Sequence, residues 1–210
     1  MAKEIVFESE ADMPLMPMSL GTTLINKTGS WRYIRPVYIN KTPPCNHACP
    51  AGEDIVTQIE LMAEGRFEEA WQRLMEENPL PGVCGRICPH FCERECNHKE
   101  MGGAIVIHLL EQFLAHYAAS HDLSVPRPET HRQERVAVVG AGACGLSAAY
   151  FLARSGYRVT LFEARNELGG RMRLVKESRL PKEVLEREIA QITDLGIEVR
   201  TGMLLGANLA

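Results

Sequence analysis

Aromatic side chains and long hydrophobic runs are scarce in this chain of 210 residues. Aromatic residues make up 6% of the sequence, and no apolar run approaches the roughly 18 residues that a membrane span requires. The first residues, MAKEIVFESEAD, lack the basic start and the apolar core of a secretory signal. These absences predict a cytoplasmic protein that does not enter the membrane.

A concentrated basic stripe is missing as well. The formal net charge is −4, and the four cations Arg165, Arg171, Arg173 and Lys176 form a local run that suits a solvated loop or contact with a cofactor phosphate. Nucleic acid is therefore not expected as a partner, because binding to its phosphates needs a positive surface. There is no internal repeat, and the composition is that of a globular protein with one large or two small domains.

Cysteine, by contrast, is concentrated. Six of the seven cysteines lie in two short segments, CNHAC at residues 45–49 and CGRICPHFCEREC at residues 84–96. In a reducing compartment such groups of thiols are more often metal ligands or redox groups than disulfides. Their spacing fits either zinc or an iron–sulfur cluster. The proline that follows Cys49 and Cys88 favours iron–sulfur, because Cys-Pro commonly ends an iron–sulfur ligand run.

The region around the cysteines has the pattern of amphipathic helices. Apolar residues recur at helical spacing in 53–64 and 66–77, and residues 103–120 predict a longer, largely buried helix. Residues 1–43 carry prolines and little periodicity, which predicts an extended arm. Two prolines and many polar side chains predict a linker at 122–134.

A different pattern begins at Arg135. VAVVG predicts a strand, AYFLARSG a helix, YRVTLFEA a second strand, PKEVLEREIAQITDLG a second helix and IEVRT a third strand. Such alternation is typical of a parallel sheet. The predicted fold class is an α-helical iron–sulfur domain, residues 44–121, followed by a partial α/β Rossmann-like parallel sheet, residues 135–210.

A glycine fingerprint lies where the first strand meets its helix. Gly140 permits a tight turn, Gly142 lets the backbone approach a pyrophosphate, and Gly145 allows the helix to pack closely on the strand. Glu163, at the end of the second strand, is expected to accept hydrogen bonds from ribose hydroxyls. Cys144 has no cysteine close by in sequence and is interpreted as a small packing residue.

The Gly-Gly pair at residues 169–170, soon after Glu163, favours FAD over NAD as the dinucleotide. The candidate cofactor contacts are Gly140, Gly142, Ala143, Cys144, Gly145, Glu163, Ala164, Arg165, Gly170 and Arg171.

Three segments, CNHACPAGEDI, ENPLPGVCGRICPHFCEREC and VAVVGAGACGLSAAYFLARSGYRVTLFEARNELGGRMRL, follow one another in the chain. Together they resemble the small (β) subunit of bacterial glutamate synthase and the N-terminal part of dihydropyrimidine dehydrogenase, over about residues 44–205. The resemblance implies [4Fe-4S] clusters in a helical domain, then an FAD domain and an NADPH domain. Electrons would pass from NADPH through FAD and the clusters to a partner site. The family subunit is longer, so the resemblance also implies truncation within the FAD domain, with the flavin site completed by a missing segment or a partner.

Carried over by position, the resemblance implies that one cluster is held by Cys49, Cys88, Cys92 and Gln112. Gln112 lies in HLLEQFLAHY, where the family has its glutamine, although the same position also suits an ordinary polar residue of a helix.

The second family cluster would use Cys45 and Cys96, but the upstream cysteine pair that completes it is replaced here by YINKTPP. Cys84, which is not at a family ligand position, is a candidate third ligand. Candidates for the fourth are His47, His90 and His98. One cluster is therefore expected, and the second is left open.

The arm segment TGSWRYIRPVY, residues 28–38, resembles the stretch ahead of the ferredoxin motif in the δ subunit of 2-oxoacid:ferredoxin oxidoreductases. The first hypothesis is an electron-transfer subunit that has other oxidoreductase subunits as obligate partners and ferredoxin or NAD(P)H as electron carrier. The alternative is a non-catalytic adaptor that keeps one cluster or a zinc ion as a structural element.

Overall fold

A computed structural model describes residues 8–12, 41–128 and 132–207. The chain divides into two compact units, Met1–Lys41 and Thr42–Ala210. In the first unit the described part is a short 3-10 turn, η1 (Glu10–Asp12), where Ser9 Oγ donates to Asp12 Oδ2 at 2.9 Å. The segment 28–38, which carries the resemblance of the predicted arm to a δ subunit, lies outside the described residues.

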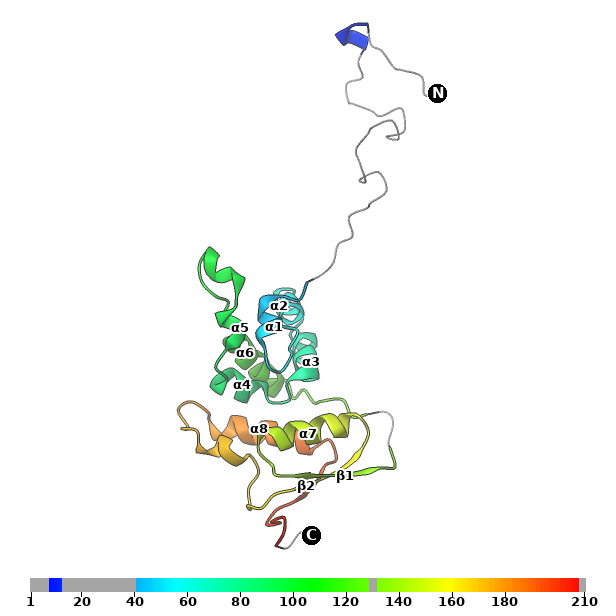
Figure 1. Ribbon diagram of the computed structural model, residues 1–210, viewed down its shortest axis with the longest axis vertical. Helices are drawn as coiled ribbons and strands as arrows, with labels where there is room; N and C mark the ends of the chain where they lie inside the picture. The colour runs from blue at the N-terminus through cyan, green and yellow to red at the C-terminus, as the bar shows by residue number, and fades with distance from the viewer. Residues whose placement is uncertain (1–7, 13–40, 129–131, 208–210) are drawn as a thin grey trace. The chain divides into compact units, whose positions relative to one another are not determined.

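The first part of the second unit is helical (Figure 1). Its elements are α1 (Pro44–Ala48), α2 (Ile55–Ala63), α3 (Phe67–Glu77), α4 (Pro81–Ile87), α5 (Phe91–Arg94), the 3-10 helix η4 (Asn97–Met101) and α6 (Ile107–Ser120). The three predicted helices correspond to α2, α3 and α6. The sequence pattern missed α1, α4 and α5, which carry the cysteines, because helices of four to seven residues are too short to show a period.

Helix α6 differs from the prediction in its burial. One face, formed by Ile107, Glu111, Leu114 and Ala118, is buried, whereas Leu109 and Phe113 on the other face are 50% and 42% exposed. The expectation of a largely buried helix was therefore wrong, because α6 is buried along one face only.

The second part is a three-stranded parallel sheet in the order β1-β2-β3. Its elements are β1 (Arg135–Val139), α7 (Ala143–Arg154), β2 (Arg158–Phe162), the 3-10 helix η5 (Gly170–Leu174), α8 (Lys182–Thr193) and β3 (Glu198–Arg200). In register, Val138 is opposite Leu161, and Leu161 is opposite Val199. The predicted fold class, helices followed by a partial Rossmann-like sheet, is confirmed. Figure 1 shows α7 and α8 as a layer between the sheet and the cysteine-bearing helices.

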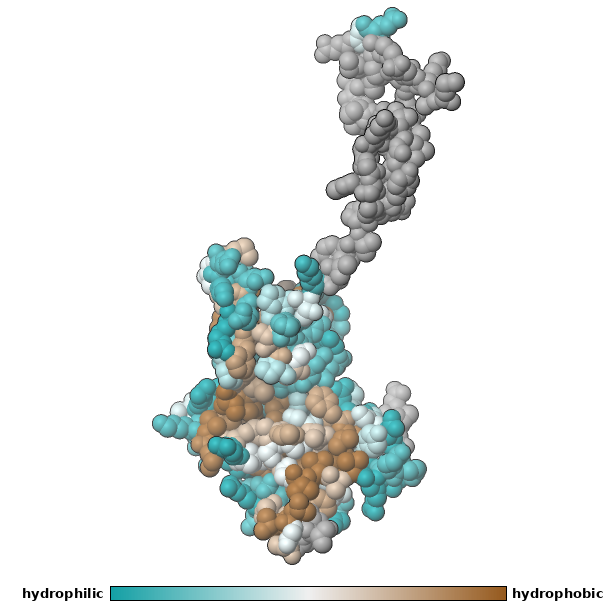
Figure 2. Space-filling view, viewed as in Figure 1, coloured by the Kyte–Doolittle hydropathy of each residue, from teal (hydrophilic) through white to brown (hydrophobic). Residues whose placement is uncertain are grey.

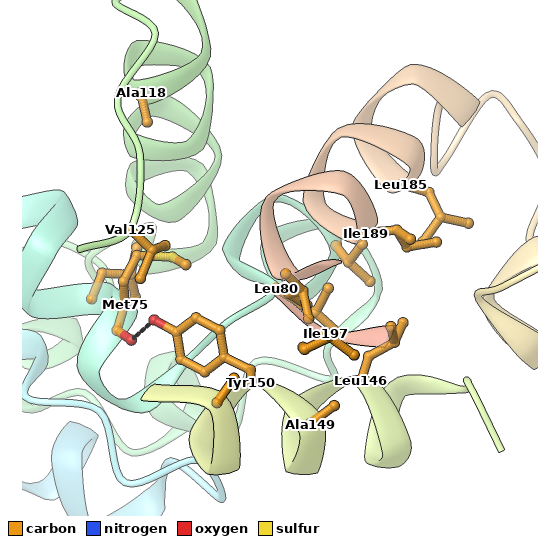
Figure 3. Packing of buried hydrophobic residues seen from close by; sticks show 14 of the residues in the cluster. Met75, Leu80, Ala118, Val125, Leu146, Ala149, Tyr150, Leu185, Ile189 and Ile197 are labelled. Carbon is orange, nitrogen blue, oxygen red and sulfur yellow. Dashed lines mark hydrogen bonds between the residues drawn. The ribbon is translucent and has the colours of Figure 1, made fainter. Parts of the chain in front are cut away.

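One hydrophobic core joins the two parts of this unit. Trp71, Leu74 and Val83 from the helical part belong to the same buried cluster as Leu161 from the Rossmann-like part. Figure 3 shows Met75 and Leu80 of this cluster beside Tyr150. Two polar anchors cross the same contact, because Tyr150 and Arg154 of α7 donate to the Met75 carbonyl and Glu188 of α8 accepts from α4 amides. The predicted linker therefore connects two parts that share a core.

Exposed large apolar residues occur on both parts of the unit. On the Rossmann-like part they are Val139, Phe151, Leu174, Val199, Leu204 and Leu205. Figure 2 shows hydrophobic surface gathered on the lower half of the molecule, over the region of α7, α8 and the sheet. None of the helices in the described part of the chain is long and apolar enough to cross a bilayer.

Candidate iron–sulfur and dinucleotide sites

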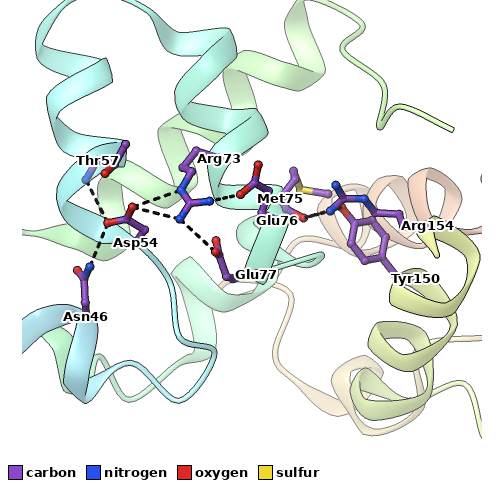
Figure 4. Close-up of polar contacts among 9 residues, drawn as sticks. All are labelled: Asn46, Asp54, Thr57, Arg73, Met75, Glu76, Glu77, Tyr150 and Arg154. Carbon is purple, nitrogen blue, oxygen red and sulfur yellow. Dashed lines mark hydrogen bonds and ion pairs between the residues drawn. The ribbon is translucent and has the colours of Figure 1, made fainter. Parts of the chain in front are cut away.

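The CNHAC segment, residues 45–49, is tied to the next two helices through Asp54. This carboxylate caps α2 by accepting from Thr57 N at 3.4 Å, and it accepts from Asn46 Nδ2 at 3.1 Å. From α3, Arg73 Nη2 donates to Asp54 Oδ2 at 3.1 Å (Figure 4). The first pair of cysteines is thus held in a fixed position by hydrogen bonds that do not involve the thiols.

Four of the clustered thiols form two pairs across the chain. Cys49 is near enough to Cys92, and Cys45 to Cys96, for their charges to interact. Cys45, Cys49 and Cys92 also pack against one small apolar cluster formed by α2 and α6. This arrangement agrees with the division into two ligand sets that the resemblance implied.

The thiols of the first set lie in an environment that both buries them and offers hydrogen bonds. Burial raises the pKa of Cys49, while the backbone amides of residues 51–53 oppose that rise. Burial also raises the pKa of Cys92, to about 12. The amide of His90 donates to Cys88 Sγ at 3.4 Å. Such amides stabilise thiolates, which are the form of cysteine that binds metal.

Cys84 lies elsewhere than expected for a ligand of the second set. Its side chain packs against the main core, and its charged neighbours include Glu111 and Cys88. Burial raises the pKa of its thiol strongly. No contact of Cys84 with Cys45 or Cys96 is found in the described residues, so the structure does not support it as their third ligand.

The candidate histidines do not complete the second set either. His98 Nδ1 lies 2.7 Å from the Gly103 carbonyl, and His47 is exposed. The His90 ring stacks on His108. Within the described residues, none of these contacts brings a histidine to Cys45 or Cys96.

Helix α6 presents Glu111, rather than Gln112, to the thiols. Glu111 is buried and lies near both Cys92 and Cys84. Gln112 uses its amide Nε2 to donate to the Gly85 carbonyl at 2.6 Å, which fastens α6 to α4. The sequence analysis did not select Glu111 as a ligand. The helical spacing of the apolar residues could have indicated it, because Glu111 falls on the buried face of α6 with Ile107, Leu114 and Ala118.

Among the described residues, no cation is recorded beside the buried carboxyl groups that lie near the thiols. Burial and the neighbouring Glu53 carboxylate raise the pKa of Glu111 to about 9, so it keeps its proton at neutral pH. Glu53 Oε1 accepts from Asn78 Nδ2 at 2.8 Å, whereas Glu53 Oε2 is buried without a hydrogen-bond partner among the described residues. A cationic centre at this place would relieve both groups, so the donor set fits a metal cluster.

The thiols in the described part of the chain are spread apart. No three of them lie within 4.8 Å of one another. An iron–sulfur cluster spreads its ligands over several iron atoms and accommodates such spacing. One tetrahedral zinc ion, with Zn–S bonds of about 2.3 Å, would bring its thiolates to roughly 3.8 Å and would require the cysteine side chains to rotate.

The glycine fingerprint has the geometry of a phosphate-binding turn. Gly140 has φ +91°, a left-handed conformation that favours glycine, and a Cβ at Gly145 would lie 1.7 Å from the Gly140 carbonyl oxygen. Nothing lies within 4 Å of the position of a Cβ on Gly142, so that backbone is open to a ligand at the start of α7. Across the loop, a Cβ on Gly170 would meet Gly142 Cα at 2.9 Å.

Glu163 has a second function in the structure besides the expected one. Its Oε2 accepts from Ala141 N at 2.7 Å and its Oε1 from Arg165 N at 2.9 Å. Burial favours a higher pKa for Glu163, but these backbone amides outweigh it and lower the pKa. The carboxylate therefore stays ionised and holds the glycine loop, with lone pairs left for a ribose.

The other candidate contacts surround this loop. Arg165 and Gly170 line a shallow hollow together with Arg173, which is paired with Glu186 at 2.6 Å. Ala164 and Arg171 are exposed next to it, and Ala143 begins α7. Cys144 is exposed in the first turn of α7, so its interpretation as a packing residue was wrong.

Comparison with known proteins agrees with both sites. Residues 37–123 match the family described as dihydropyrimidine dehydrogenase domain II, 4Fe-4S cluster. The helical part is therefore similar to this iron–sulfur family. Residues 138–198, beyond the iron–sulfur domain, match the family of NAD(P)-binding Rossmann-like domains. The resemblance inferred from the cysteine and glycine motifs is therefore confirmed, together with a [4Fe-4S] domain and a dinucleotide-binding domain.

Curated relatives contain both domains in one chain. NADPH-Fe(3+) oxidoreductase subunit beta of Geobacter sulfurreducens is 37% identical over 82% of this chain and 26% of the relative. NADP(+)-dependent formate dehydrogenase subunit beta of Moorella thermoacetica is 33% identical over 80% of this chain and 27% of its own length. NAD-dependent dihydropyrimidine dehydrogenase subunit PreT of Salmonella typhimurium is 32% identical over 80% of this chain and 41% of its own length. The chain thus spans between about a quarter and two fifths of the relatives it matches.

Proposed function

We propose that this chain is the electron-transfer part of a multi-subunit, NAD(P)H-linked oxidoreductase, which relays electrons between FAD and a partner catalytic subunit. The observation that carries the proposal is the presence, in one compact unit, of buried or half-buried clustered thiols and a glycine loop open to a dinucleotide. The names of the relatives, which are subunits of oxidoreductases, support this reading.

The cluster ligands that we propose are Cys49, Cys88, Cys92 and Glu111. Glu111 takes the place that the sequence gave to Gln112, because Glu111 lies by Cys92 while Gln112 is bonded to the backbone of α4. Its carboxyl would release its proton when the cationic cluster binds. A second cluster held by Cys45 and Cys96 remains a prediction, and it would need two further ligands.

When bound, a [4Fe-4S] cluster carries single electrons, and FAD exchanges the two electrons of a hydride for them. The chain itself supplies the surroundings. The apolar cluster of Ile55 and Ile107 keeps water from Cys92, and backbone amides donate toward Cys49 and Cys88. Hydrogen bonds to the sulfurs and exclusion of solvent are the means by which a protein sets a cluster's potential.

We further propose obligate partner subunits, with ferredoxin or NAD(P)H as the electron carrier, and a cytoplasmic location. Clustered thiols that bind iron need a reducing compartment, which supports the location. The adaptor alternative keeps one cluster or a zinc ion as a structural element, and bound flavin distinguishes the electron-transfer subunit from it.

The test is the composition of protein purified without oxygen. The proposal expects about four iron and four sulfide per cluster, bound flavin, and visible absorption that bleaches on reduction. Cys92→Ser is expected to lose the iron, while Cys144→Ser, which changes an exposed thiol outside the two cysteine segments, keeps it. Protein that contains zinc, no acid-labile sulfide and no flavin would support the adaptor instead.

A second comparison tests the ligand from α6. Glu111→Ala is expected to lower the iron content or alter the spectrum of the reduced cluster, whereas Gln112→Ala should leave both unchanged and only weaken the contact of α6 with α4. The opposite pattern would return the ligand role to Gln112.

A further inference from the structure

Three side chains outside the proposed ligand sets converge at the junction of α5 and α6. His90 precedes α5, Glu93 lies within α5, and His108 lies in the first turn of α6. Each offers a ligand atom, and these atoms all lie within 4.8 Å of one another. All three residues are half-buried.

His90 is held there at a conformational cost. Its φ is +54°, a left-handed conformation that non-glycine residues rarely adopt. Its ring lies 4.3 Å from the His108 ring at an interplanar angle of 12°, and its Nε2 atom is buried without a hydrogen-bond partner among the described residues. A histidine pair that only filled space would not need a strained backbone and an unpaired ring nitrogen.

Glu93 and His108 form the other half of the group. Glu93 Oε1 lies 2.7 Å from His108 Nδ1 and also accepts from the His108 amide at 2.9 Å. A carboxylate that fixes a histidine ring in this way is the usual companion of a metal-binding imidazole. The only cation recorded near His90 in the described part of the chain is Arg179, and its Nε is tethered to the Arg86 carbonyl at 3.1 Å.

We propose that His90, Glu93 and His108 bind one divalent transition-metal ion, separate from the iron held by the thiols. Imidazole and carboxylate ligands suit zinc, cobalt, nickel or copper. Ligand atoms about 2.1 Å from a tetrahedral ion lie roughly 3.4 Å apart, so binding requires the three side chains to move closer together. Because the three residues are half-buried, water can take the fourth position. The site depends on this chain's own residues and not on the proposed electron-transfer function.

The experiment is a Co²⁺ titration of the protein with its iron–sulfur cluster in place, so that the cluster thiols are occupied. Wild type is expected to take up one Co²⁺ with the absorption of nitrogen and oxygen ligands. His90→Asn, which tolerates the left-handed backbone, and His108→Gln are each expected to weaken binding by at least the 10- to 100-fold typical even of outer-shell changes. His116→Ala, an exposed histidine on the same helix, is the matched control and should bind as wild type does.

A measurement on the unaltered chain guards against variants that fold poorly. Addition of Zn²⁺ should shift the ring NMR signals of His90 and His108 and leave those of His116 in place. The proposal is overturned if wild type binds no Co²⁺, if the His90 and His108 variants bind it as tightly as wild type, or if the bound Co²⁺ shows the charge-transfer absorption of thiolate ligands. Equal zinc shifts at all three histidines would also refute it.

Discussion

The contact between α7 and the end of α3 allows a quantitative test. Met75 is near the C-terminus of α3, where carbonyls lack partners within the helix. Tyr150 Oη donates to the Met75 carbonyl at 2.6 Å, and Arg154 Nη1 donates to the same oxygen at 3.1 Å (Figures 3 and 4). Tyr150 is fully buried. The carbonyl therefore has two donors, and either one can satisfy it.

We expect Tyr150→Phe and Arg154→Met each to lower the free energy of unfolding by about 1 kcal/mol, the net value of one hydrogen bond. The double variant removes both donors and leaves a buried carbonyl unsatisfied, which adds about 1 to 3 kcal/mol. Its cost should therefore exceed the sum of the single costs by about 1 to 3 kcal/mol. Urea denaturation of the four proteins measures this coupling.

The reasoning is refuted if the two substitutions add to within about 0.5 kcal/mol, as substitutions at independent sites do. Tyr157→Phe is the matched control. The Tyr157 ring also lies by an arginine, Arg132, at 4.8 Å, but its hydroxyl makes no hydrogen bond among the described residues. Its replacement should cost little and should not couple to Arg154.

Three further outcomes follow from buried or exposed groups. Burial raises the pKa of Glu188 to about 7, so between about pH 4.5 and 7 the folded chain holds a proton that the unfolded chain has lost. The free energy of unfolding should therefore fall by about 3 kcal/mol as pH rises over this range. Urea titrations should show that Glu188→Gln removes this dependence of stability on pH. Gly145→Ala should lower the melting temperature, since its Cβ would lie 1.7 Å from the Gly140 carbonyl oxygen. Gly142→Ala should keep the melting temperature and lose flavin binding. An equal fall in melting temperature for both variants would contradict the geometry. FAD should slow alkylation of the exposed Cys144, and an unchanged rate would place the dinucleotide elsewhere.

The dinucleotide loop could be predicted because its requirements are local. The tight turn at Gly140 and the close approach at Gly145 depend on residues within one strand and one helix, and the sequence contains them in order. The function of Glu163 in holding the loop could not be read in the same way, since its partner Ala141 becomes a neighbour only when β2 lies beside β1.

In the cysteine region, the position of one thiol could not be predicted from the local sequence. Cys84, Cys88, Cys92 and Cys96 are evenly spaced, and nothing in their spacing tells that the first of them packs into the core. That depends on α4, which lies against both α6 and α8. A Cβ on Gly82 would meet Glu188 Oε1 at 2.7 Å, so the helices are in close contact there.

The choice between Glu111 and Gln112 was open to a closer reading of the sequence. The two residues are adjacent, and the helical period that starts at Ile107 selects Glu111 for the buried face. The sequence pattern did not indicate that Glu188 is buried. A charged residue on an amphipathic helix is expected in solvent, and only tertiary contact with the amides of Gly82 and Val83 explains its burial.

The core shared by α3, α4, α7 and α8 sets a condition for protein engineering. A chimera that joined residues 44–121 to an unrelated reductase would leave Trp71, Leu74 and Val83 facing water and the α4 amides without the Glu188 carboxylate. A transplant of the cysteine-bearing helices must therefore include α7 and α8. A fusion point at the proline-containing connection, although it lies between the two parts in sequence, would divide the shared core.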